Sequence, residues 1–452
     1  MKIDVLVAEI GSTTTIINAF DNLSRDPVFL GQGMSETTAE DVGSGLMQAR
    51  KDLETKLGFK VEAKETFATS SAAGGLKMSV HGLVYDMTVK AAKEAALGAG
   101  ANLKLITAGK LSPFDLKRIQ KLNPNIILLA GGVDYGETET ALFNSQAIAA
   151  LKLNIPIIYA GNIVNQDAVK EIFKDFTQEA YLYLTPNVYP KIDTLNVNPA
   201  RKIIHTVFEK HITEAPGMEK IRNLINGQII PTPGAVMKAA ILLQKALGDL
   251  FCIDIGGATT DVFSVAEDTE KIGKVLFAPE PFSKRTVEGD LGVYVNKDNL
   301  VELIGKTEIQ KNLKLTNEEL ERILENYQKI PDAKQIPLTE LLAYTALKTA
   351  LERHVGKIIT LYGSSGKIQA AEGKDLSGIK YVIATGGSLT RLPNRKTLIE
   401  TYFQKKNPKL LLPEGEVKIL IDHDYIMASS GILSTKYPEA ALKLLLKSME
   451  GL

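Results

Sequence analysis

One stretch organises the chain: FCIDIGGATTDVFS, residues Phe251–Ser264. An apolar run, a Gly-Gly turn with small residues after it, and a second apolar run predict a β-hairpin with an unobstructed tip. Backbone N–H groups and threonine hydroxyls at such a tip can bind a phosphate, and Asp254 and Asp261 are placed to bind a hydrated Mg²⁺. The alternative is an ordinary glycine-rich turn.

Two further stretches favour the phosphate interpretation. Near the amino terminus, VLVAEIGSTTTII (Val5–Ile17) repeats the order of apolar strand, acid, glycine, hydroxyl cluster and apolar strand. Two such hairpins can hold a polyphosphate from both sides. A third stretch, YVIATGGSLTRLP (Tyr381–Pro393), is an apolar strand that ends in Gly386-Gly387, where a base and ribose can lie against bare backbone.

In this order, the three stretches resemble the motifs of the actin, sugar-kinase and heat-shock-chaperone ATPase superfamily. The first hairpin resembles its phosphate-1 motif, Asp254–Ser264 its phosphate-2 motif, and Gly386–Ser388 with Thr390-Arg391 its adenosine motif. Pro233–Val236 and Ala428–Gly431 are similar to the two connecting helices of the superfamily. Small residues there would let these helices cross closely beneath the cleft.

The resemblance implies an α/β protein with two actin-like lobes and a cleft between them. Within residues 101–190, short apolar strands alternate with helices, which predicts an inserted doubly wound module with a parallel sheet covered on both faces. We expect lobe I in residues 1–100 and 191–248, the latter including a connecting helix, and lobe II in residues 249–452. A long helix over residues 340–361 is expected before the adenosine strand.

A glycine pair also occurs inside the expected module, in Ala130–Asp134. It follows a predicted strand, so it lies at the carboxyl edge of the sheet, where ligands of such folds bind. It is either a small-molecule or partner-docking site, or a plain turn between strand and helix.

A narrower resemblance is carried by four stretches: Ser70–Leu76, Glu214–Gly217, Pro231–Val236 and Arg285–Gly292. They look like the glutamate mutase accessory family, GlmL, also called MutL, which shares only its name with a DNA mismatch-repair protein. The family is similar to the reactivating ATPases of adenosylcobalamin enzymes. The resemblance therefore implies ATP or ADP and Mg²⁺ as cofactors, and an adenosylcobalamin-dependent mutase of the glutamate mutase or aminomutase type as partner.

The resemblance also implies roles for individual residues. Asp254 would hold Mg²⁺-bound water or the attacking water; the other contacts would come from Gly256, Gly257, Ala258 and Thr259 (β- and γ-phosphates), Gly11, Ser12 and Thr13 (the opposing clamp), and Gly386, Gly387 and Ser388 (adenosine). Glu9, the second candidate catalytic and metal residue, stands where the superfamily usually has Asp, and its extra methylene moves the carboxylate by about 1.5 Å. Because Mg²⁺ demands near-ideal distances, this change either weakens hydrolysis or shifts a bridging water.

Composition bounds the remaining possibilities. The 452 residues are 44% hydrophobic and 23% charged, as expected for a folded protein of two or three domains. Lys plus Arg and Asp plus Glu both number 53, which gives no net field to attract nucleic acid or an anionic membrane. The lone Cys252 cannot form an internal disulfide, and neither a signal peptide nor a membrane-spanning run is evident. We therefore expect a cytoplasmic protein.

Three functions compete. The first is an ATP-driven accessory or reactivating factor for an adenosylcobalamin mutase. The second is a small-molecule kinase, which needs a base near the γ-phosphate; the sequence offers no obvious carboxylate outside the phosphate motifs. The third is a nucleotide-bound scaffold with negligible turnover, which Glu9 leaves open. The family resemblance favours the first.

Overall fold

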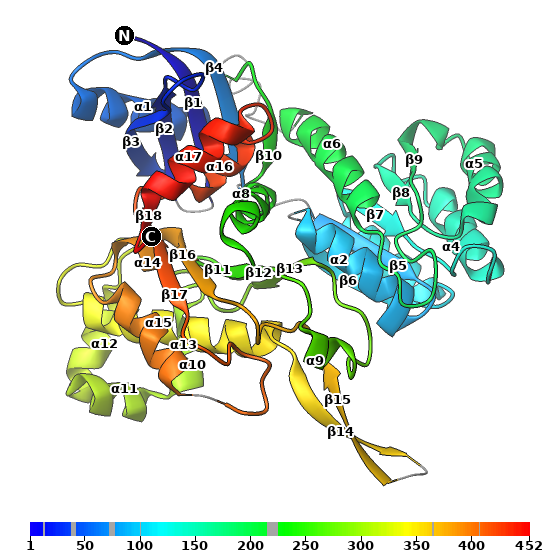
Figure 1. The fold of residues 1–452 in the computed structure, drawn as a ribbon. Coiled ribbons are helices and arrows are strands. Elements are labelled where there is room, and N and C mark those ends of the chain that lie inside the picture. Colours follow the sequence, from blue (N-terminus) through cyan, green and yellow to red (C-terminus); the bar gives the residue numbers. More distant parts are fainter. Residues whose placement is uncertain are drawn as a thin grey trace.

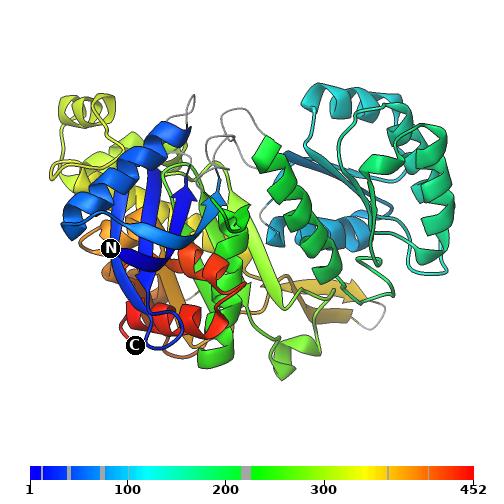
Figure 2. The same cartoon turned by 90° about the horizontal axis from the view of Figure 1, so that it is seen from above.

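The computed structural model describes residues 1–11, 14–37, 42–71, 77–99, 101–214, 225–363, 366–405 and 407–452; Ser12 and Thr13 lie outside them. Two lobes lie one above the other, and a third body lies to one side of both (Figures 1 and 2). None of the described helices is long and apolar enough to cross a bilayer.

Lobe I is built on a five-stranded sheet with the order β10-β4-β1-β2-β3. Its strands are β1 (Lys2–Ile10), β2 (Thr14–Asp21), β3 (Val28–Glu36), β4 (Glu62–Ser70) and β10 (Ile229–Pro231). β1 runs antiparallel to β2 and parallel to β4. Its helices are α1 (Val42–Leu57), α6 (Asn198–Glu214), α8 (Thr232–Leu247), α16 (Met427–Leu433) and α17 (Pro438–Ser448).

The sheet of lobe II has the order β13-β12-β11-β16-β17-β18. Its strands are β11 (Leu250–Ile255), β12 (Thr260–Val265), β13 (Ser283–Glu288), β16 (Tyr381–Thr385), β17 (Lys418–Asp422) and β18 (Met449–Glu450). As in lobe I, three antiparallel strands are followed by two strands parallel to the first. The two sequence hairpins therefore occupy equivalent places, β1–β2 and β11–β12, and the expected two-lobed actin-like class is confirmed.

The two connecting helices, α8 and α16, contact each other through their backbones. A side-chain carbon added at Gly431 of α16 would lie 1.8 Å from the carbonyl oxygen of Ala235 in α8. Only glycine allows such an approach, so the predicted close crossing of the two connecting helices is confirmed.

The third body is the expected parallel α/β module, with the sheet order β6-β5-β7-β8-β9. Its strands are β5 (Lys77–Gly82), β6 (Asn102–Ala108), β7 (Ile126–Leu129), β8 (Ile157–Tyr159) and β9 (Leu182–Leu184), and its helices are α2 (Lys90–Gly98), α3 (Pro113–Leu122), α4 (Glu139–Ala150) and α5 (Gln166–Asp175). β5 pairs with β6 and β7, although we placed these residues in lobe I. The domain limits remain proposals, and this pairing favours a start of the module before Lys77.

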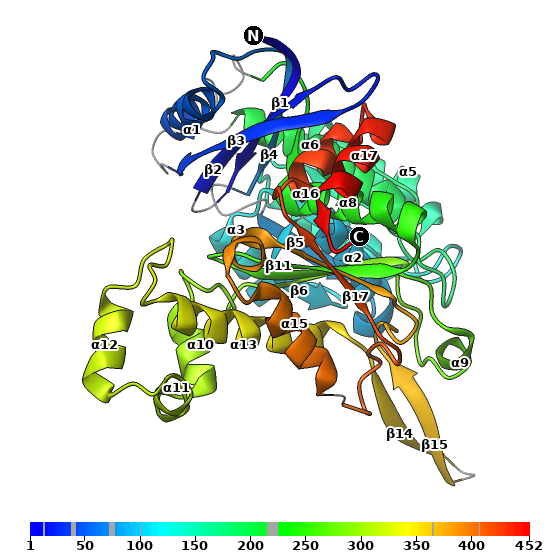
Figure 3. The same cartoon turned by 60° about the vertical axis from the view of Figure 1, so that its left-hand side comes forward.

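Lobe II carries the helices α9 (Glu270–Gly273), α10 (Lys297–Ile304), α11 (Lys306–Leu313), α12 (Asn317–Glu325), α13 (Ile336–His354), α14 (Gly386–Arg391) and α15 (Arg395–Gln404). The helix expected over residues 340–361 is wrong at its end, because α13 stops at His354. The chain then forms a projecting hairpin of β14 (Lys357–Gly363) and β15 (Gly366–Glu372), shown in Figure 3.

Candidate functional site

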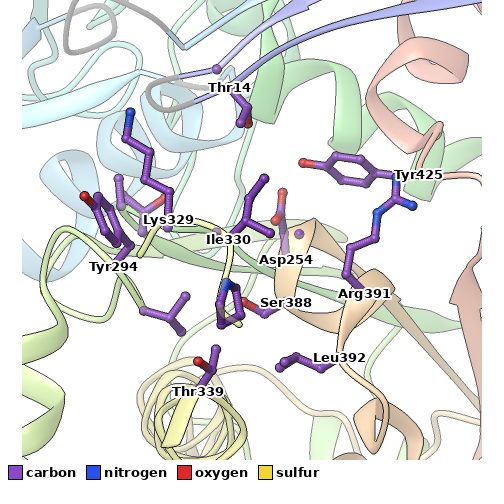
Figure 4. A pocket seen from close by; sticks show the side chains of 18 of the residues that line it. Thr14, Asp254, Tyr294, Lys329, Ile330, Thr339, Ser388, Arg391, Leu392 and Tyr425 are labelled. Carbon is purple, nitrogen blue, oxygen red and sulfur yellow. The ribbon is translucent and has the colours of Figure 1, made fainter. Parts of the chain in front are cut away.

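A cavity of about 460 Å³ lies between the lobes, where the two hairpin tips and the start of α14 meet. Figure 4 shows Asp254 in it, with Thr14 of lobe I on one side and Ser388 and Arg391 of α14 on the other. Most of the predicted site residues line it: Glu9, Gly11, Asp254, Gly256, Gly257, Ala258, Thr259, Gly387 and Ser388.

The two hairpin tips are closed by the same hydrogen bond. The N–H of Gly11 donates to the carbonyl of Thr14, and that of Gly256 to the carbonyl of Thr259, both at 2.9 Å. A side chain at Gly11 would meet the Thr14 carbonyl oxygen at 2.6 Å. The described ends of the two tips are therefore closed in the same way, by a hydrogen bond from the glycine to the threonine three residues later.

The loop Leu291–Asn296, whose first two residues belong to the Arg285–Gly292 stretch of the narrower resemblance, fixes the second tip. The carbonyl of Gly257 accepts from the N–H groups of Tyr294 (2.9 Å) and Val295 (2.8 Å). The carbonyl of Ala258 accepts from the side-chain amide of Asn296 at 2.8 Å. Within the described ranges no acceptor pairs with the N–H groups of Gly257 and Ala258, so both remain available to a ligand.

Asp254 is the central acid of the cavity. No hydrogen-bond donor of the described chain contacts its carboxylate. Burial, followed by the neighbouring carboxylates of Asp261 and Glu9, raises the pKa of Asp254 to about 7. Arg285 offsets the charge of the ionised form only in part, and a bound cation would stabilise that form further.

The donor set fits a magnesium ion held mainly by a nucleotide. Among the residues described, no group of three or more His, Cys, Asp or Glu side chains is arranged to hold a metal. Mg²⁺ commonly binds through one or two carboxylates together with water and substrate phosphates. Asp254 meets that requirement without further protein ligands.

Glu9 is anchored to the second connecting helix. Its Oε1 accepts from the N–H of Ser429 (2.9 Å), from the Ser429 hydroxyl (2.5 Å) and from the side-chain amide of Asn18 (3.2 Å). Burial, with the nearby carboxylate of Asp422, raises the pKa of Glu9 to about 7. The extra methylene of Glu relative to Asp is thus used to tie β1 to α16.

The second acid of the hairpin, Asp261, is already paired. Its Oδ1 lies 2.6 Å from Nη2 of Arg285, and its Oδ2 accepts from the hydroxyl of Thr259 at 3.1 Å. Arg285 is 3% exposed and also donates to the carbonyl of Leu97 in α2 at 3.1 Å. Asp261 therefore braces the second hairpin tip against the inserted module, and its Oδ1 is not a free metal ligand.

The two glycines of the third motif differ in their surroundings. Gly386 has a φ of +85°, and a side-chain carbon there would lie 2.3 Å from Oδ1 of Asp254. Such a carbon at Gly387 would meet no atom within 4 Å. Gly386 therefore packs against the acid, whereas Gly387 leaves open space at the cavity wall.

The sequence analysis counted Arg391 in the adenosine motif without giving it a contact, and it did not identify Lys329 or Tyr425 as contributors to the cavity. Arg391 donates to the side-chain oxygen of Gln32 at 2.9 Å, which links the adenosine motif to lobe I. Lys329 and Glu36 form a second contact between the lobes at 3.2 Å. Tyr425, whose pKa burial raises, lies beside Asp254 (Figure 4). These residues come from distant segments, and only Arg391 stands in a recognisable motif.

Comparison with known proteins gives one consistent family. The family model described as MutL protein matches residues 5–449. Protein MutL of Clostridium tetanomorphum is 38% identical over 457 residues, which cover 98% of each chain.

Solved structures show a weaker likeness. Nucleotide-free acetone carboxylase is 14% identical with a TM-score of 0.42, covering 96% of this chain and 70% of that one. Component A of (R)-2-hydroxyglutaryl-CoA dehydratase from Acidaminococcus fermentans is 8% identical with a TM-score of 0.33, covering 97% and 99%. TM-scores below 0.5 are too low to support any conclusion about function.

Proposed function

We propose, from the premise that this chain belongs to the MutL protein family, that it is an ATP-binding accessory protein that reactivates an adenosylcobalamin-dependent mutase. The observation that carries the nucleotide part is the cavity, in which two equivalent hairpin tips face each other around Asp254. The partner part rests on the family.

In this proposal the nucleotide lies with its phosphates between the tips. The free N–H groups of Gly257 and Ala258, with Gly256, Thr259 and Gly11, would bind the β- and γ-phosphates, and Ser12 and Thr13 are proposed to complete the clamp. Gly386, Gly387 and Ser388 would hold adenosine. Asp254 would hold Mg²⁺ through water, and a bound Mg²⁺ would neutralise charge on the phosphates.

The chain's own residues would do the remaining work. With a pKa of about 7, Asp254 can hold or release a proton of a water molecule near neutral pH. Glu9, hydrogen-bonded to Ser429, would make β1 and the connecting helix α16 move together when the lobes open and close. Opening and closing of the lobes about the crossing helices would then be transmitted to the partner enzyme.

The test is the rate of ATP hydrolysis by the purified chain, with and without purified glutamate mutase whose cofactor has been damaged. We expect the mutase to raise the rate, and Asp254→Ala to abolish that rise. Asp175→Ala, an exposed acid at the end of α5, is the matched control and should behave as the unmodified chain. Unchanged hydrolysis in the presence of the mutase would contradict the accessory role.

A scaffold with negligible turnover is the second candidate. One carboxylate oxygen of Glu9 already accepts three hydrogen bonds from the protein itself, which leaves it less available to a metal ion or water. Nucleotide binding without phosphate release under any condition would favour it. Transfer of labelled phosphate from ATP to a metabolite, in the absence of any protein partner, would favour a kinase instead.

A further inference from the structure

The carboxyl edge of the module sheet carries an exposed apolar surface. In the sheet order β6-β5-β7-β8-β9, the connections leave in opposite directions from β5 and β7, which makes the crevice beside these strands the usual binding place of such folds. Gly131-Gly132, the glycine pair that we expected at a docking site or a plain turn, follows β7 at this edge.

The glycine pair is not shaped for a small polar ligand. A side-chain carbon at Gly131 would lie 2.5 Å from Cβ of Ala141, so this glycine is required for packing of α4. The carboxylate of Asp134 accepts from the side-chain amide of Asn187 and from the N–H of Ile163, both at 2.9 Å. The glycine and the acid that a ligand would use are thus occupied by the fold.

Apolar side chains are exposed on the loops at this edge. We define the module-edge surface as the exposed residues Val84, Tyr85, Tyr135, Ile163, Val164 and Ile192. Three of its loops are joined directly, since the N–H of Tyr135 donates to Asn162 at 3.0 Å and that of Asp134 to the carbonyl of Pro190 at 3.0 Å.

Tyr135 is the most prominent member. It is 84% exposed and has a φ of +62°, a conformation that non-glycine residues adopt rarely. The hydrogen bond from its N–H to Asn162 holds this backbone in place. An aromatic side chain presented on a fixed loop, with aliphatic neighbours, is the composition of a protein-binding hot spot.

The rim of the surface is acidic. Exposed Asp86, Glu137 and Asp193 lie on the same loops, against a single exposed lysine in them, Lys191. A complementary partner surface would have an apolar centre with Lys or Arg around it.

We propose that the module-edge surface docks the mutase, through a patch of that enzyme with an apolar centre and a Lys or Arg rim. This inference rests on the proposed function for the choice of partner. It adds the place of contact and its chemistry.

The experiment measures the affinity of the full chain for purified glutamate mutase by isothermal titration calorimetry. We expect Tyr135→Ser to weaken binding about 30-fold, the effect of losing a hot-spot side chain. Asp193→Lys reverses a charge on the rim, so it should weaken mutase binding more at low salt than at high salt, where charges are screened. Phe277→Ser, which changes an exposed aromatic residue on lobe II (64% exposed, against 84% for Tyr135), is the matched control and should bind as the unmodified chain. ATP affinity and thermal unfolding verify that each variant is folded.

Each outcome decides between the surface and the partner. Loss of mutase binding in Tyr135→Ser, with ATP binding retained, supports the inference. If Tyr135→Ser and an Ile163→Ser variant both bind the mutase as tightly as the unmodified chain does, the docking surface is overturned, but the proposed function is not. An unmodified chain that binds ATP but not the mutase overturns the proposed function, and the docking inference with it. Self-association that disappears in Tyr135→Ser, measured by sedimentation without the mutase, would assign the surface to a second copy of the chain and overturn the inference.

Discussion

Replacing Gly386 by Ala tests the packing of the adenosine motif against the central acid. The added carbon would lie 2.3 Å from Oδ1 of Asp254 and 2.6 Å from the backbone nitrogen of Ile255, so something must move. Forcing a non-glycine residue into the left-handed region costs about 1–2 kcal/mol. Overpacking at a rigid site adds about 1–3 kcal/mol. We therefore expect a loss of about 2–5 kcal/mol in the unfolding free energy of lobe II.

The assay is urea unfolding together with calorimetric titration of ATP. Gly387→Ala is the matched control, because its added carbon meets no protein atom, and alanine favours a helix by up to about 1 kcal/mol. Gly387→Ala should thus keep or gain stability and yet bind ATP less tightly, if adenosine lies against this wall. Equal stability of Gly386→Ala and the unmodified chain would refute the packing argument. If Gly387→Ala binds ATP as tightly as the unmodified chain, adenosine does not lie against this wall.

Three other predictions concern charge and loop packing. The pKa values of Asp254 and Glu9 are raised to about 7 from 3.8 and 4.5, so between these limits of pH the folded chain binds more protons than the unfolded chain. The melting temperature of the nucleotide-free protein should therefore fall as the pH rises through this range, and Asp254→Asn should make that fall smaller. Arg285→Met leaves Asp261 buried and unpaired and should cost about 3–5 kcal/mol in urea unfolding, whereas a cost near zero would deny the ion pair a structural role. Gly292→Ala would push a carbon within 2.3 Å of the phosphate-loop backbone and should lower ATP affinity in calorimetry, and unchanged affinity would exclude that loop from the site.

The hairpins were predictable because their decisive contacts are local. The strand that ends at Ile255 pairs with the strand that begins at Thr260, so the turn between them is determined by a few residues. The same reasoning located the tip at Gly11. The connecting helices were predicted from their resemblance to those of the superfamily, and their small residues predicted the close crossing, since a backbone contact excludes larger ones.

What could not be predicted depends on contacts between distant segments. No local pattern shows that Arg285 neutralises Asp261 while also bonding Leu97, because that requires knowing which helix covers the strand. The contacts that the loop Leu291–Asn296 makes with the second hairpin tip could not be predicted for the same reason. The roles assigned to individual site residues stay predictions until a nucleotide is bound.

The error at the end of α13 had a signal that was overlooked. Gly356 interrupts the helical pattern, and Ile358, Ile359 and Thr360 are β-branched residues, which favour strands. A side-chain carbon at Gly356 would lie 2.7 Å from the backbone of Gly373, so the glycine is needed where the two chain segments meet at the base of the hairpin.

The contact between Gly431 and Ala235 has a mechanical consequence. With no side chain between the two backbones, we expect the lobes to rotate about this contact, which would then act as a fulcrum. A side chain at Gly431 would force the two backbones apart, although Gly431 is not among the predicted phosphate-binding residues.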